Sequence, residues 1–181
     1  MRKTVWIAAL CIFVPMAAHA QGAAPSPAAN PVTSTAQRYL DRYTKNIMGA
    51  AETMPEDKYG YKPTPAQMGF GQSIAHIAEV NNFSCSKFAD IPMPSGDKVT
   101  EKDSKEKLMA ALKGSFDYCA QTIAKLDDSK LGDSITFFGG RQTSRAAAVF
   151  ELIDDLSDHY GQLSIYLRLN GLLPPSAQPK K

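Results

Sequence analysis

DDLSDHYGQLSIYLRLNG, residues 154–171, is the stretch that decides the fold. Its apolar residues recur at alternating steps of four and three, the spacing of an α-helix with one buried side; they are Leu156, Tyr160, Leu163 and Leu167. Beside this apolar stripe, Asp155 and His159 are four residues apart and therefore lie one above the other on the helix. The stretch predicts a helix that places a carboxylate and an imidazole against its own buried face.

Three more segments show the helical spacing, and no strand-rich region accompanies them. They cover about residues 34–54, 70–89 and 104–126. The last helix is expected to start at Thr143 or Ser144 and to end at Gly171, a natural left-handed stop. Residues 129–142, SKLGDSITFFGGRQ, contain one strand-like run without a visible partner, so we expect a loop with an apolar plug. The sequence predicts an all-α four-helix bundle over residues 34–173.

The two ends of the chain have different compositions. Residues 1–20 combine a basic start, an apolar run and the small-x-small site Ala18-His19-Ala20, which is typical of a secretory signal peptide. Residues 21–33 are rich in Ala, Pro and Ser and are expected to be a disordered leader. Residues 174–181 begin with two prolines and are expected to be a flexible tail. We therefore expect a periplasmic or secreted protein.

The charge balance argues against polyanionic partners. The chain has 20 basic and 18 acidic residues, and removal of Arg2 and Lys3 with the signal peptide leaves 18 of each. Without a basic stripe we expect neither nucleic acid nor, after cleavage, a membrane as a partner. A small molecule is the expected partner, and a homodimer is compatible with this interpretation.

Two histidines follow the signal peptide, His76 and His159. Asp155 and His159 can converge on one ion, and His76, on the second predicted helix, is the other imidazole available to complete the site. Two imidazoles and a carboxylate suit a divalent zinc, nickel, iron or manganese ion and leave positions open for water or substrate. The alternative is that these residues bind no metal, because an Asp-x-x-x-His pair is common on helices and a partly buried histidine usually forms a hydrogen bond with a neighbour.

Two segments, KPTPAQMGFGQSIAHIAEVNN and DHYGQLSIYLRLNG, resemble the DinB-like (DinB/YfiT) superfamily. This resemblance implies a four-helix bundle in up-down-down-up order, with the second and fourth helices adjacent and a divalent metal held by three histidines. His76 and His159 match the first and last of these, and Asp155 stands where the middle histidine is expected. A carboxylate at that position favours harder ions.

Three further residues are candidates for the surroundings of the metal or for substrate contact: Glu79, Tyr160 and Gln162. Cys85 and Cys119 each lie 15 residues beyond the start of their helices, counted from Phe70 and Ser104. In the parallel arrangement that the resemblance implies, their sulfurs would lie at the same height, and an oxidising compartment would favour a disulfide. Two separate buried thiols are the alternative.

Relatives in this superfamily include thiol-dependent transferases and isomerases. The resemblance therefore implies an exported metal-binding protein, either a metal-dependent hydrolase or a thiol-dependent transferase. The alternative is a non-catalytic bundle that serves as a ligand-binding or interaction module. The sequence names no substrate and no catalytic residue beyond the three metal-ligand candidates.

Overall fold

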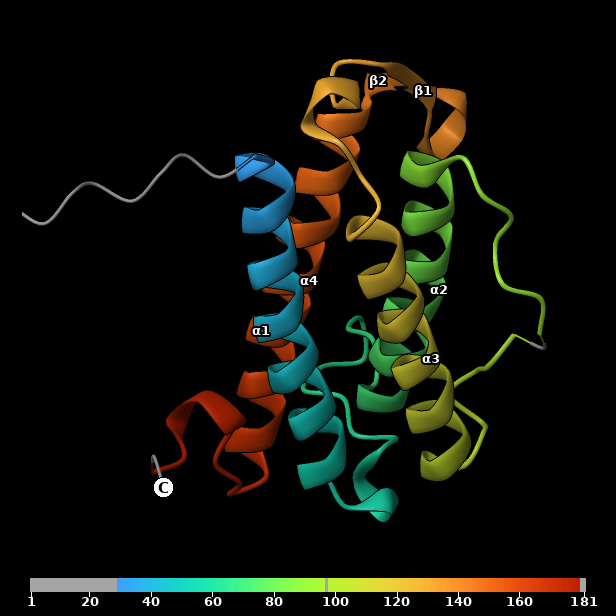
Figure 1. Cartoon of the computed structure of the whole chain (residues 1–181). Coiled ribbons are helices and arrows are strands. Elements are labelled where there is room, and N and C mark those ends of the chain that lie inside the picture. The colour runs from blue at the N-terminus through green and yellow to red at the C-terminus, as the bar shows by residue number, and fades with distance from the viewer. Residues whose placement is uncertain (1–28, 97, 180–181) are drawn as a thin grey trace, which may run out of the picture.

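Four helices lie side by side in the computed structural model, which describes residues 29–96 and 98–179 (Figure 1). They are α1 (Pro31–Thr53), α2 (Phe70–Ala89), α3 (Lys105–Ile123) and α4 (Arg145–Leu169). The predicted all-α bundle is therefore confirmed. The predicted signal peptide and most of the predicted leader lie outside the described residues. Among the residues that are described, no helix combines the length and the apolar character needed to cross a bilayer.

The helices follow the expected order. In Figure 1, α1 runs downward, α2 and α3 run upward, and α4 runs downward again. Helix α2 packs against both α3 and α4, and α1 packs against the same two helices. The link between α2 and α3 runs back along the bundle, which allows these consecutive helices to be parallel. The adjacency of α2 and α4, on which the predicted metal site depends, is present.

Local residues at the helix ends explain three of the boundaries. Ser104 and Ser144 cap α3 and α4, each accepting a hydrogen bond from a backbone amide three residues on. Gly171 has a φ of 73°, the left-handed conformation expected after α4. Helix α3 ends at Ile123, a few residues before the predicted end near 126, and a short 3-10 turn, η1 (Glu56–Lys58), follows α1.

Helix α1 begins three residues earlier than predicted, at Pro31. The backbone amides of Val32 and Thr33 donate to the carboxylate of Asp128, at 2.8 and 2.9 Å. Asp128 lies in the 3-10 turn η2 (Asp128–Lys130), so the cap comes from a distant part of the chain. A local sequence pattern could not reveal it, and the predicted leader boundary at residue 33 was wrong for this reason.

The loop predicted for residues 129–142 was also wrong in part. Strands β1 (Ser134–Thr136) and β2 (Gln142–Ser144) form an antiparallel hairpin around the turn η3 (Phe138–Gly140). In that turn Gly139 and Gly140 have φ values of 65° and 79°, which other residues rarely adopt. The partner strand was missed because its residues overlap the cap of α4. The apolar plug is present, since Ile135 and Phe137 are buried.

The C-terminal segment is packed rather than frayed. It forms the 3-10 turn η4 (Pro175–Ala177), which contacts α1. The Tyr160 hydroxyl donates to Ser176 Oγ at 2.6 Å and accepts from the Ser176 backbone amide at 2.9 Å. A Cβ added at Gly49 would lie 2.9 Å from Pro175 Cγ, so the missing side chain lets the turn approach. The turn is therefore held against α1 and by Tyr160, although the sequence predicted a flexible tail from residue 174.

The core lies between the four helices and contains aliphatic and aromatic side chains from each. Its largest completely buried members include Ile47, Met54, Phe70, Phe88, Leu112, Phe116 and Tyr166. Close packing of this apolar surface supplies the main driving force for the fold and holds α2 against α4.

Candidate metal centre

His76, Asp155 and His159 converge in the structure. Helix α2 carries His76, and α4 carries the other two one turn apart. One ligand atom from each residue lies within 4.8 Å of the others. This is looser than the separation of about 4 Å that ligands of a common ion require. Within the described residues, no other group of three histidine, cysteine or acidic side chains meets in this way.

The distance between Asp155 and His159 suits two ligands better than a hydrogen bond. Asp155 Oδ1 lies 3.5 Å from His159 Nε2, beyond the usual hydrogen-bond range. Two atoms about 2.1 Å from one ion, at the tetrahedral angle, are roughly 3.4 Å apart. The ring centroids of His76 and His159 are 5.0 Å apart and their planes meet at 65°. A small side-chain movement of the half-buried His76 would bring the three ligand atoms, now within 4.8 Å of one another, to the closer spacing that one ion requires.

Two polar atoms in this group are buried without a hydrogen-bond partner. They are Asp155 Oδ2 and His159 Nδ1, and the His159 side chain as a whole is only 6% exposed. Buried polar atoms are nearly always paired, and an unpaired one costs about 1–3 kcal/mol. A carboxylate and two imidazoles are a donor set that a divalent transition ion accepts. The residues present therefore fit a metal ion.

The three residues expected around the metal have other partners. Glu79 is exposed and forms an ion pair with Lys98. Tyr160 holds the C-terminal turn through Ser176, as described above. Gln162 donates to the exposed carboxylate of Asp158 at 2.6 Å. None of these contacts reaches His76, Asp155 or His159.

A cavity of about 320 Å³ opens beside His76 and Asp155. Its other lining residues come from α2, α4 and the β1–β2 hairpin: Val80, Ser84, Phe137, Phe138, Glu151 and Leu152. A larger, more open cleft at the C-terminal end of α2 contains none of the three ligands, so the chemistry favours the smaller cavity. The sequence did not predict this lining, although Ser84 follows His76 by eight residues and therefore lies on the same side of α2.

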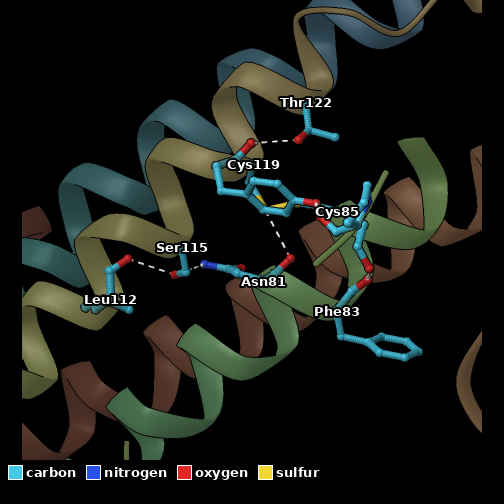
Figure 2. Close-up of a disulfide and its surroundings, with 10 residues drawn as sticks. Asn81, Phe83, Cys85, Leu112, Ser115, Cys119 and Thr122 are labelled. Carbon is cyan, nitrogen blue, oxygen red and sulfur yellow. Dashed lines mark hydrogen bonds between the residues drawn. A yellow bond between two sulfur atoms is a disulfide. The ribbon is translucent and has the colours of Figure 1, made fainter. Parts of the chain in front are cut away.

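Cys85 and Cys119 join the parallel helices α2 and α3 (Figure 2). Their Cα atoms are 5.4 Å apart, and the sulfurs form a disulfide. Beside it, Asn81 Nδ2 donates to Ser115 Oγ at 3.0 Å, linking the same helices by a buried hydrogen bond. The parallel arrangement places the two cysteines at one height, as the topology requires.

The comparisons with known proteins identify the family. A model described as the DinB superfamily matches residues 39–163, more than half of the chain. The protein therefore belongs to the DinB superfamily. A search of curated proteins found no match.

Solved structures share the fold at low sequence identity. A DinB-like protein from Bacillus cereus ATCC 10987 is 15% identical, with a TM-score of 0.65, over 78% of this chain and 95% of that chain. A DinB-like protein from Bacillus subtilis is 19% identical, with a TM-score of 0.63, over 83% of this chain and 100% of that one. The mycothiol-dependent maleylpyruvate isomerase is 10% identical, with a TM-score of 0.60, over 72% of this chain and 60% of that chain.

Proposed function

We propose that the protein binds one divalent transition-metal ion through His76, Asp155 and His159. With this ion bound, the protein acts as a metal-dependent hydrolase or a thiol-dependent transferase. The observation that carries this proposal is the convergence of the three side chains. Their ligand atoms lie within 4.8 Å of one another, and Asp155 Oδ1 lies 3.5 Å from His159 Nε2. His159 is buried and Asp155 is partly buried, so a cation between them would offset part of the cost of holding these polar side chains away from water.

The number of protein ligands and the lining of the adjacent cavity suit a catalytic metal centre. Three protein ligands leave positions for a small molecule or water, as in catalytic rather than structural metal sites. A bound divalent ion would lower the pKa of a coordinated thiol or water and so supply a nucleophile near neutral pH. The apolar side chains of Val80 and Leu152, which line the adjacent cavity, would limit bulk water there.

Two observations support the choice of reaction and compartment. The fold is shared with a mycothiol-dependent maleylpyruvate isomerase, which supports including thiol chemistry among the proposed reactions. The Cys85–Cys119 disulfide is typical of proteins from oxidising compartments and agrees with the proposed export to the periplasm or beyond. An exported thiol-dependent enzyme would need a thiol that is present outside the cytoplasm.

Metal analysis of the untagged protein tests the proposal. We expect about one zinc, nickel, iron or manganese ion per chain, lost in His76→Ala, Asp155→Asn and His159→Ala. Asp154→Asn is the matched control, because Asp154 is exposed on the same helix and does not belong to the group. At a free ion concentration 100 times its Kd, the bound ion should stabilise the protein by about 2.7 kcal/mol, measurable by thermal unfolding.

The rival function is a non-catalytic ligand-binding or interaction module. Asp155, at the position where the family resemblance implies a histidine, is the feature that favours it. Metal-free protein whose stability does not respond to any of the four ions would refute the metal centre and leave this rival. Metal lost equally from Asp154→Asn would show that the ion binds to exposed carboxylates instead.

A further inference from the structure

The cavity beside the candidate metal centre has a composition that defines a ligand. We infer that it binds a compact aromatic carboxylate whose carboxylate reaches the metal and whose far end carries a hydroxyl group. This inference rests on the proposed function. The cavity volume of about 320 Å³ is near the lower limit for small-molecule sites, which selects a ligand with one ring.

Ser84 supplies the polar contact at the far end of the cavity. Its side chain is 1% exposed, it lines the cavity, and its Oγ has no hydrogen-bond partner among the described residues. A buried helical serine usually bonds to a backbone carbonyl one turn back, so its unpaired hydroxyl is unusual. Ser84 lies two helical turns beyond His76, roughly 12 Å along α2. A ligand that contacts both must be longer than a simple acetate-sized anion.

Phe137 and Phe138 form an aromatic wall over the same cavity. Phe137 is buried and Phe138 is 44% exposed, and their ring centroids are 4.6 Å apart at an interplanar angle of 71°. Phe138 also stacks on Phe83, with centroids 4.3 Å apart. Phe83, on α2, therefore packs against both aromatic rings of the hairpin and holds them in place. A ligand ring between this wall and Leu152 would gain apolar burial and an aromatic contact.

The charges favour a single negative group on the ligand. Two neutral imidazoles, one carboxylate and a divalent ion leave a net charge of +1, which one carboxylate would neutralise. Glu151 also lines the cavity, but Arg141 Nη2 donates to both of its carboxylate oxygens, at 2.8 and 2.7 Å. This ion pair cancels the charge that would otherwise repel an anion from the cavity.

The test uses cobalt(II)-loaded protein and three probes: acetate, phenylacetate and 4-hydroxyphenylacetate. Affinities come from calorimetry, and the visible cobalt spectrum reports whether the carboxylate reaches the ion. We expect phenylacetate to bind about tenfold more tightly than acetate, and the added hydroxyl to give about a further fivefold.

Two variants separate the contacts. Phe138→Ala should remove the preference for the ring, and Ser84→Ala should remove only the preference for the hydroxyl. Phe150→Ala and Ser164→Ala are the matched controls. Phe150 is exposed on α4, and Ser164 is also a buried serine with an unpartnered hydroxyl; neither lines this cavity. Both controls should keep the wild-type order of affinities.

The outcomes distinguish this inference from the proposed function. If cobalt binds but the three probes bind equally, or if the variants behave like their controls, the ligand assignment is overturned and the metal centre stands. If binding leaves the cobalt spectrum unchanged, the carboxylate does not reach the ion and the assignment is likewise overturned. If cobalt does not bind to His76, Asp155 and His159, the proposed function fails and this inference falls with it.

Discussion

Reduction of the Cys85–Cys119 disulfide should destabilise the bundle strongly. The bond links α2 to α3 across 34 positions of sequence, and both cysteines are completely buried. In the chain-entropy model, the cross-link restricts the unfolded chain and leaves the folded packing almost unchanged. The perturbation to apply is therefore reduction of the wild-type protein, which removes the cross-link without removing either sulfur from the core.

The magnitude follows from the length of the closed loop. For a loop of about this size, the chain-entropy relation gives roughly 4 kcal/mol at 25 °C. With a urea dependence of about 2 kcal/mol per molar for a domain of this size, the unfolding midpoint should fall by roughly 2 M on reduction. The urea dependence itself should increase, because the reduced unfolded chain is less compact and exposes more surface.

Urea unfolding followed by circular dichroism measures both quantities in the presence and absence of a reductant. The reductant must be present during unfolding and refolding, because the folded protein shields the buried bond. Cys85→Ala/Cys119→Ala is the control, and its unfolding curve should not respond to the reductant. A difference below about 1 kcal/mol between oxidised and reduced wild type would refute the reasoning. An equal response of the double variant would show that the reductant acts elsewhere.

Three other changes test separate parts of the structure. Arg145→Met should lower the free energy of unfolding, measured in urea, by roughly 2 kcal/mol, because the buried Arg145 donates to the Phe88 carbonyl and to Asp90 at the end of α2. An unchanged free energy of unfolding would contradict this capping role. Burial raises the pKa of Asp128, but the hydrogen bonds from Thr33 and Val32 together lower this pKa by more than burial raises it. The pKa of Asp128 is therefore below its usual range. Asp128→Asn should therefore be less stable than wild type at neutral pH, and the difference should shrink as the pH falls below about 4, the pKa of an unfolded aspartate; a difference independent of pH in acid titrations of stability would refute this. Asp155→His should shift the metal content from manganese towards zinc or nickel in competition dialysis, because it exchanges a hard oxygen ligand for an imidazole; an unchanged metal ratio would show that Asp155 is not a ligand.

The sequence by itself determined the helices and the identity of the candidate ligands. Apolar periodicity is a local property, so α2 was predicted with both of its boundaries, and the helix starts near Ser104 and Ser144 were also predicted. The one-turn spacing of Asp155 and His159 follows from helix geometry alone. The proximity of His76 required the family resemblance, because no local pattern tells which helices are neighbours.

Only the tertiary structure decided what depends on contacts between distant segments. The cap that Asp128 gives to α1, the pairing of β1 with β2 and the packing of η4 each join residues that the sequence does not mark as partners. The same holds for the aromatic part of the cavity lining, since Phe137 and Phe138 become neighbours of the candidate metal centre only when the hairpin packs against α2 and α4. Helical spacing places side chains on one face, whereas the choice of what covers that face is made by long-range packing.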